Sequence, residues 1–404
     1  AYILAVNPSY LGGIDGMSAG AVFSATAISA GIATLCMAFF ANYPVALASG
    51  MGLNAFFAFT VCGAMGYSYK VALTAVFIEG IIFMLLSLFK FREALVNKIP
   101  SNLKFAITAG IGLFIAIIAL LNANVVVASE STTVALGELS SPTVVLSLVG
   151  LLIIGALQHY KVPGGILLGI LITWVLGIIA QLVGWYVPNP EAGVYSVIPQ
   201  FSLSSFEAPK MFQFDFGFIA KNVPAFILIV FTFLYTDIFD TVGTLIGVAE
   251  KGKLLDKDGS LPNATGALMA DAVGTVVGAC LGTSTVTSYV ESSAGVAAGG
   301  RTGLTAVTTA VLFFISLIFA PIFTSIPSFA TTPAMLYVGL LMLSSIRQVK
   351  FDGDIADAIG AFLAIIMMPL TYSIANGIMF GIVSWVILKL VTGKAKDISA
   401  VMWI

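Results

Sequence analysis

Two acidic side chains three residues apart lie within a strongly apolar stretch, FTFLYTDIFDTVGTLIG, at residues 231–247. On a helix, Asp237 and Asp240 would share one face, about one turn apart. An aspartate at the centre of a bilayer costs about 2.5–3.5 kcal/mol on insertion scales, so such acids usually face a cavity or a partner and mark substrate or proton pathways. The spacing therefore predicts a polar site at membrane depth that both carboxylates line.

Three further side chains fit the same site. Glu291 lies in GTSTVTSYVESSAGVAAGG (residues 282–300), and Asn54 lies in NYPVALASGMGLNAFFAF (residues 42–59), beside Phe57. A carboxylate accepts hydrogen bonds from N–H groups, an amide donates and accepts, and a phenyl ring stacks on a planar ligand. No lysine or arginine lies near the centre of any span, so a flat, neutral heterocycle with several N–H groups fits better than an anion. Less certain candidates are Phe56, Thr287 and Ser288.

Proton coupling is the second chemistry that these acids favour. A buried carboxyl group without a basic partner tends to take up a proton, because desolvation disfavours its charged form. We therefore expect Asp240 or Glu291 to bind and release a proton during transport, while Asp237 acts as a substrate ligand. The alternative is structural, with protonated acids that only hydrogen-bond neighbouring helices. Glu79 and Asp271 lie in unbroken apolar stretches and fit that alternative at least as well.

The composition requires a membrane setting for these residues. The chain has 404 residues, of which 59% are hydrophobic and 9% are charged, with a mean hydropathy of +1.07. Soluble domains have roughly 45–50% apolar and about 25% charged residues. Apolar runs of about 20 residues recur, long enough as helices to cross a hydrocarbon core of roughly 30 Å and without the alternation of barrel strands. The sequence predicts an all-α integral membrane protein.

Fourteen apolar spans can be distinguished, the first of them partial: 1–8, 18–41, 44–60, 66–89, 103–122, 143–159, 163–185, 222–249, 264–281, 284–299, 302–322, 332–346, 355–370 and 372–391. If the first span runs from inside to outside, only three of the seventeen basic residues fall outside, namely Lys70, Lys210 and Lys221. This positive-inside bias predicts cytoplasmic termini in a plasma membrane, most simply a bacterial inner membrane.

A long polar interruption at 184–221 divides the chain into seven spans on each side. Because seven is odd, the half at 222–404 would enter the membrane with inverted orientation relative to the half at 1–183, as in inverted-repeat transporters. The third span of each half, at 42–59 and at 282–300, is short, rich in small and polar residues, and broken by proline or glycine. Such matched, broken segments point to a midplane binding site, and packing through small residues is the alternative for either one alone.

Neither a cofactor nor a metal site is expected. The three cysteines, Cys36, Cys62 and Cys280, lie in apolar segments without CxxC spacing and read as packing residues. His159, the single histidine, lies at the end of a span, where an interfacial position fits better than a proton relay. No metal-ligand set or nucleophile constellation indicates an enzyme, and no catalytic residue or nucleic-acid partner is predicted.

Several motifs in fixed order resemble one family. YTDIFDTVGTLIGVAEKGKLLDKDG and GTSTVTSYVESSAGVAAGGRTGLTAV, preceded by AYILAVNP and ASGMGLNAFFAF, closely resemble the AzgA-like adenine, guanine and hypoxanthine permeases of the nucleobase/ascorbate transporter superfamily. The resemblance covers essentially the whole chain. It implies fourteen spans in two inverted repeats, proton-coupled purine uptake and commonly a homodimer. It also implies a core domain of approximately spans 1–4 and 8–11 and a gate domain of approximately spans 5–7 and 12–14.

The resemblance also assigns residues. Asp237 and Asp240 match the family's eighth-helix acids, Glu291 matches its tenth-segment acid, and Asn54 matches its third-segment asparagine. An aromatic residue of the third segment stacks on the base in related uracil permeases, and this position looks like Phe57, with Phe56 as the alternative after a one-residue slip. Those relatives carry a glutamate in the eighth helix and a TYGEN-like stretch in the tenth, where this chain has an aspartate and TSYVES, as purine-type relatives do.

Together these observations predict a secondary active transporter that imports adenine, guanine or hypoxanthine by proton symport with alternating access. Two alternatives stay open. One is an anion or bicarbonate transporter of the same fold, against which three acids and the lack of a central Arg or Lys argue. The other is a nucleobase channel or facilitator, which uptake against a gradient would exclude. The choice among the purines, and between a proton and sodium, also stays open at this stage.

Overall fold

The computed structural model describes residues 3–88, 100–129, 132–188, 196–198, 207–254, 261–289, 291–297, 299–371 and 373–398. Within these ranges, nine helices are long and apolar enough to cross a membrane. Three shorter apolar helical stretches accompany them, at Met51–Ala64, Ile355–Thr371 and Asn376–Val391. The expected all-α, multi-pass membrane protein is confirmed, whereas the number of fourteen spans stays a prediction.

The first half of the chain contains α1 (Ile3–Leu11), α2 (Ala19–Phe40), β1 (Leu47–Ser49), α3 (Met51–Ala55), the π-helix η1 (Phe56–Ala64), α4 (Tyr69–Leu88), α6 (Ser101–Asn122), β2 (Val126–Ser129), β3 (Thr133–Leu136), α7 (Pro142–His159) and α8 (Gly165–Leu182). The second half contains α9 (Gly217–Lys221), α10 (Val223–Gly252), α11 (Ala264–Leu281), β4 (Val286–Ser288), α12 (Ser292–Ala297), α13 (Gly303–Ser316), η3 (Leu317–Phe319), α14 (Ala320–Thr324), α15 (Ser328–Leu343), η4 (Ser344–Gln348), α16 (Ile355–Thr371), α17 (Ile374–Val391) and η5 (Ala395–Asp397).

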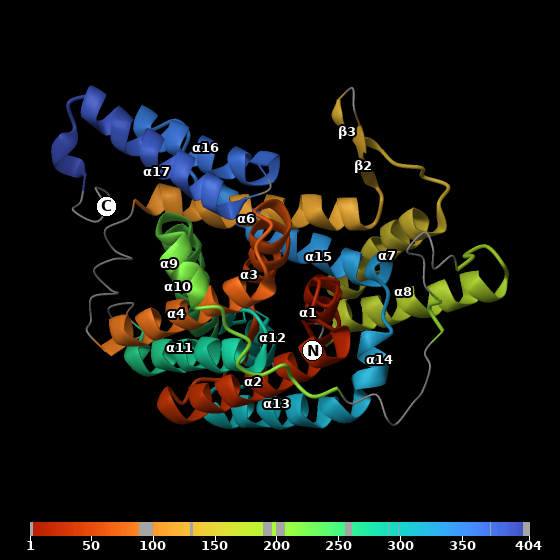
Figure 1. Cartoon of the computed structure of the whole chain (residues 1–404). Helices are drawn as coiled ribbons and strands as arrows, with labels where there is room; N and C mark the ends of the chain where they lie inside the picture. The colour runs from red at the N-terminus through yellow and green to blue at the C-terminus, as the bar shows by residue number, and fades with distance from the viewer. Residues whose placement is uncertain are drawn as a thin grey trace.

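Two groups of helices pack mainly among themselves. In the first group, α11 packs on α2 and α4, α13 packs on α2, and α10 packs on α4. In the second group, α6 packs on α15 and α16, α15 packs on α7 and α8, and α16 packs on α17. Figure 1 shows α2, α11 and α13 at the bottom of the molecule and α16 and α17 at the top. This packing is the basis for the proposal of core and gate domains below.

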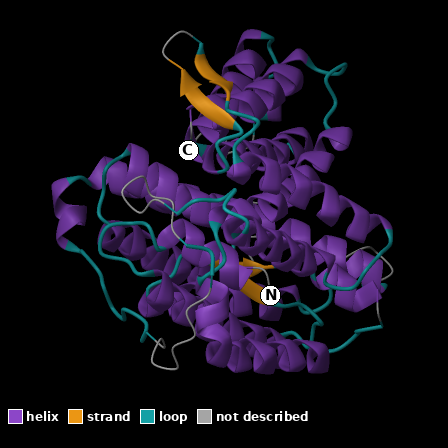
Figure 2. Ribbon diagram, turned by 90° about the vertical axis from the view of Figure 1, so that its right-hand side faces the viewer, coloured by secondary structure: helices purple, strands orange, loops and turns teal. Residues whose placement is uncertain are grey.

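The two broken segments meet between the helices of the first group. β1 and β4 pair antiparallel, with Leu47 opposite Ser288, Ala48 opposite Thr287 and Ser49 opposite Val286. Figure 2 shows this pair in orange close to the N label, with helices around it. All six strand residues are buried. The expectation that the third and tenth segments are broken is therefore confirmed.

Threonine hydroxyls form hydrogen bonds with backbone groups at the outer edges of this short sheet. The Thr34 hydroxyl, on α2, accepts from Leu47 N at 2.9 Å and donates to Leu47 O at 3.1 Å. On the other edge, the Thr275 hydroxyl of α11 donates to Val286 O at 2.9 Å. An unpaired backbone group at membrane depth costs several kcal/mol, so the strands depend on these side chains. Each strand is thus held by the helix that precedes it in the chain.

A second, exposed hairpin follows α6 and was not expected from the sequence. Its strands β2 and β3 pair antiparallel from Val126 opposite Leu136 to Ser129 opposite Thr133. The β-branched residues of VVAS and TVAL favour strand conformation. These residues lie between two expected spans. Hydropathy windows identify membrane segments and do not detect short strands outside them.

Candidate functional site

The α10 helix contributes Asp237, which is fully buried. Its Oδ1 lies 3.4 Å from the hydroxyl of Thr241, one turn further along the helix. The same hydroxyl lies 2.9 Å from Asp271 Oδ2 on α11 and 2.8 Å from Thr287 Oγ1 on β4. A hydroxyl group has one proton, so Thr241 donates over the shorter path to Asp271 and accepts from Thr287. Asp237 therefore lies at the edge of a buried polar network that joins α10, α11 and β4.

Asp271 lies at the centre of this network. Both its oxygens accept hydroxyl protons, Oδ2 from Thr241 at 2.9 Å and Oδ1 from Ser288 at 3.0 Å. The side chain is fully buried. Asp271 therefore forms hydrogen bonds between helices, as the structural alternative described. The Ser288 hydroxyl bonds to Asp271 directly, and the Thr287 hydroxyl belongs to the same network through Thr241.

Asp240 and Glu291 form a separate group. Asp240 is half-buried on α10, and Glu291 is half-buried on the turn before α12. The two carboxyl groups are close enough for their charges to repel each other, and the Tyr289 phenol lies near both. The Tyr289 hydroxyl donates to Ser49 O at 2.5 Å, which ties this group to β1. Like charges that lie close together in a partly buried position are costly.

Asn54 occupies the first broken segment, on α3, and is fully buried. Its Oδ1 accepts a hydrogen bond from the Ser284 hydroxyl, at the start of the second broken segment. Among the described residues, its Nδ2 makes no hydrogen bond. A buried amide donor without a partner costs about 1–3 kcal/mol, so this atom is suited to donate to a ligand.

Phe56 and Phe57 follow Asn54 and pack against Phe233 of α10. Both contacts are T-shaped, with ring centroids 4.8 Å apart for Phe56 and 6.4 Å apart for Phe57. Phe233 lies four residues before Asp237, on the same face of α10. The structure therefore brings the aromatic pair of the first broken segment to the α10 face that carries the buried acid.

Asn7 on α1 is a buried polar residue that the sequence analysis missed. Its Nδ2 donates to Thr26 Oγ1 at 2.7 Å and to Thr283 Oγ1 at 2.8 Å. Thr26 uses its own proton on Val22 O at 2.6 Å, so it must accept from Asn7, which fixes the orientation of the amide. Among the described residues, Asn7 Oδ1 makes no hydrogen bond. The signal in the sequence was an asparagine followed by proline within an apolar run.

The stretch TSTVTS at residues 283–288 links all these groups. Each of its polar side chains bonds to a different element, and these bonds pair Thr283 with Asn7, Ser284 with Asn54, Thr285 with Glu79 at 3.4 Å, Thr287 with Thr241, and Ser288 with Asp271. Small-residue packing is therefore not the reason for this composition. The hydroxyls hold the crossing of the broken segments against α1, α3, α4, α10 and α11.

The remaining polar candidates lie outside this crossing. His159 is exposed at the end of α7, where its ring has an edge contact with Tyr160. The three cysteines are free and partly buried. Over the described ranges, no three His, Cys, Asp or Glu side chains gather in a way that could hold a metal ion.

A mainly helical membrane fold, with two broken segments crossing beside buried acids, is typical of a membrane transporter. The chain superposes on the transmembrane domain of BicA, a cyanobacterial bicarbonate transporter, with a TM-score of 0.67 at 16% identity, over 93% of this chain and 94% of that one. It superposes on SLC26A9 with a TM-score of 0.67 at 10% identity, over 97% of this chain and 64% of that one. At these identities the likeness shows a shared fold.

The family model for xanthine and uracil permeases, described as the Permease family, matches residues 2–380, and the chain belongs to this family. It is 45% identical over 404 residues to a putative permease of Methanocaldococcus jannaschii, covering all of this chain and 89% of the relative. It is 42% identical to an adenine permease of Escherichia coli (98% and 86% covered) and 42% identical to a guanine/hypoxanthine permease of Bacillus subtilis (100% and 90% covered). The resemblance to adenine, guanine and hypoxanthine permeases is thereby confirmed, and the family is one of transporters rather than enzymes.

Proposed function

We propose that this permease is a secondary active transporter that imports purine nucleobases, namely adenine, guanine or hypoxanthine. The relatives that cover nearly the whole chain are named for these bases. The observation that links the proposal to a site is the fully buried amide of Asn54, whose Nδ2 makes no hydrogen bond within the part of the chain that the structure describes. The rings of Phe56 and Phe57, which follow it, pack on Phe233, one turn before Asp237 on α10. A ring nitrogen or carbonyl oxygen of a purine would accept from that donor and offset its desolvation cost.

In the proposed complex, Asp237 and Glu291 accept hydrogen bonds from purine N–H groups. Asn54 donates to an acceptor on the edge of the base, and Phe57 lies against the ring, with Phe56 as the alternative. Hydrogen bonds to charged groups contribute about 1.5–3 kcal/mol each, so two carboxylates supply most of the polar recognition. Thr287 and Ser288 act indirectly in this arrangement, because their hydroxyls support Asp271 and Thr241.

We further propose proton symport through the pair of Asp240 and Glu291. One proton held between neighbouring carboxyl groups leaves the pair with a single charge, and its release on the inner side would couple transport to the proton gradient. Asp240 then handles the proton while Asp237, whose neighbour Thr241 bonds to Asp271 on α11 and Thr287 on β4, binds the base.

Alternating access is proposed as a movement of one helix group against the other. The core comprises α1–α4 and α10–α13 with both broken segments, and the gate comprises α6–α8 and α15–α17. The core carries every polar residue assigned above, so its movement against the gate would expose the site to each side in turn. We also propose the inverted repeat and a homodimer, which the resemblance implies. Cytoplasmic termini in a plasma membrane are proposed from the positive-inside distribution of basic residues.

A competition experiment tests the substrate class. Uptake of radiolabelled adenine is measured in proteoliposomes against unlabelled adenine, guanine, hypoxanthine, xanthine and uracil, and against bicarbonate. We expect at least one of the three named purines to compete strongly, and uracil and bicarbonate to compete weakly. Uptake of radiolabelled bicarbonate by proteoliposomes that take up no adenine would instead identify the anion transporter that shares the fold.

A further inference from the structure

A cleft of about 830 Å³ lies at one end of the proposed core. Its walls come from the end of α1, the loop that follows it, η1 and the start of α4. Two residues of the other helix group complete it, Asn122 at the end of α6 and Ser328 at the start of α15. The cleft therefore lies at the seam between the two groups, where a substrate must pass if the groups move relative to each other.

Four aromatic side chains line this cleft, together with Asp15, Lys70 and several small or polar residues. Tyr10, Phe59, Tyr67 and Tyr69 all line it, and the rings of Tyr10 and Phe59 meet edge to face at 5.3 Å. Gly16 closes the loop at φ +85°, and a Cβ there would lie 2.6 Å from the Tyr69 ring, so only glycine lets the loop pack on that ring. Stacking of a base on an aromatic ring is worth about 1–3 kcal/mol. The walls thus suit a planar heterocyclic base.

The cleft and the proposed purine site share one wall. η1 is a π-helix of nine residues that continues directly from α3, which carries Asn54. Phe57 on η1 faces the α10 contact described above, whereas Phe59 and Cys62 line the cleft. Phe59 lies five positions after Asn54, on the order of 7 Å along a helix. π-helical turns often occur at functional sites.

We propose that this cleft is an outer vestibule that binds a purine base by stacking on Phe59 and the neighbouring tyrosines before the base moves along η1 to Asn54 and Asp237. The inference rests on the proposed function, whose site it extends. Lys70 lines the same cleft and is one of the three basic residues placed outside by the positive-inside distribution, so the cleft faces the outer side of the membrane.

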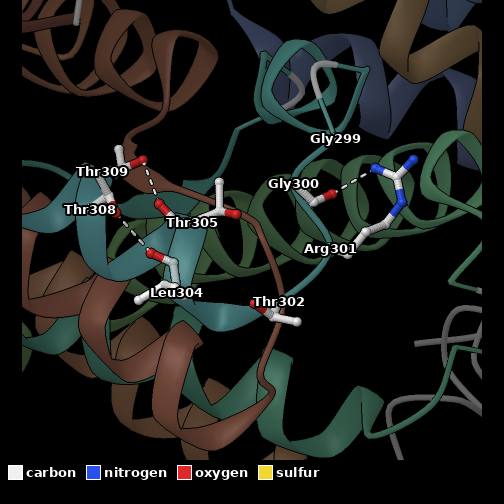
Figure 3. A pocket seen from close by; sticks show the side chains of 8 residues that line it. All are labelled: Gly299, Gly300, Arg301, Thr302, Leu304, Thr305, Thr308 and Thr309. Atoms are coloured by element: carbon white, nitrogen blue, oxygen red, sulfur yellow. Dashed lines mark hydrogen bonds between the residues drawn. The ribbon is translucent and has the colours of Figure 1, made fainter.

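A second groove, of about 480 Å³ at Gly299–Thr309, lacks these features (Figure 3). The residues that line it include no aromatic ring. The Arg301 guanidinium donates to Val296 O and Gly300 O, and the Thr308 and Thr309 hydroxyls donate to carbonyls one turn earlier in α13. Its polar groups are thus used within the chain, and the groove does not offer the stacking surface that a base requires.

Cys62 provides a probe, because it lines the cleft and is partly exposed. In the full chain with Cys36→Ser and Cys280→Ser, a membrane-impermeant thiol reagent is applied from outside, and the labelling rate of Cys62 is followed with and without adenine. A variant that also carries Cys62→Ser has no cysteine left and is the control for labelling at other residues. We expect adenine to slow the labelling, and to do so equally when Asp237→Asn disables the inner site. No protection, or protection lost in Asp237→Asn, would overturn the vestibule.

Substitutions at Phe59 test the stacking surface itself. Phe59→Ala should raise the adenine concentration for half-maximal protection roughly tenfold, and Phe59→Tyr should keep it near the original value, since the ring is retained. Phe39→Ala, on an exposed position of α2, is the matched control and should change nothing. Equal protection in Phe59→Ala and the parent would contradict the proposal. Adenine uptake without protection would refute the vestibule alone, and protection without uptake would refute the transport function alone.

Discussion

Exchanging Asp237 for asparagine removes the charge of the proposed substrate ligand while keeping its shape. The side chain is fully buried, and its Oδ1 lies 3.4 Å from the Thr241 hydroxyl, a contact that the amide oxygen of asparagine can keep as an acceptor. A hydrogen bond to a carboxylate is worth about 1.5–3 kcal/mol. Its loss should raise the KM for adenine about 10- to 150-fold.

Asp271 offers the matched comparison. It is equally buried, and both its oxygens accept hydroxyl protons, at 2.9 and 3.0 Å. Asp271→Asn replaces one acceptor by a donor and should lower the free energy of unfolding by about 1–3 kcal/mol. Uptake kinetics in proteoliposomes and thermal unfolding in detergent separate the two effects. An unchanged KM in Asp237→Asn, with both variants equally destabilised, would refute the distinction between ligand and scaffold.

Three further variants extend the test. Glu291→Gln should abolish accumulation driven by a pH gradient, and wild-type accumulation in this variant would exclude it from proton coupling. Asn7→Ala removes two hydrogen bonds at 2.7 and 2.8 Å and should lower the free energy of unfolding by about 1–3 kcal/mol, an effect that an unchanged melting temperature would rule out. Hydrogen bonds from Lys389 and Lys394 hold the pKa of Asp354 well below its usual range, so its stabilising contribution is present at neutral pH and is lost as acid protonates it. Asp354→Asn should therefore lower the melting temperature at pH 7 and converge with wild type as the pH falls below about 4, whereas a pH-independent difference would contradict this cause.

The bilayer explains how much of the fold the sequence could predict. Long apolar runs and the broken segments at 42–59 and 282–300 are visible locally, because each span must satisfy its own backbone in lipid. The expected boundaries of the eighth span, at 222–249, lie within three residues of the ends of α10. Outside the membrane this constraint is absent, and the β2–β3 hairpin was missed.

Partners across the site could not be predicted in the same way. Thr283 bonds to Asn7 across 276 positions, and Ser284 bonds to Asn54 across 230. Nothing in a local pattern joins such residues. Spacing alone put Asp237 and Asp240 on one face, but it could not show that α10 packs on α4, α12 and β4, or that Glu291 lies near Asp240.

Proton-driven accumulation of adenine tests the central claim most directly. Proteoliposomes that contain the full chain receive an inward proton gradient, and internal radiolabelled adenine and internal pH are followed together. The account predicts that adenine rises above its external concentration, that protons enter with it, and that a protonophore abolishes both. Adenine that only equilibrates, without proton entry, would contradict symport and identify a facilitator, and entry no faster than into empty liposomes would contradict purine transport itself.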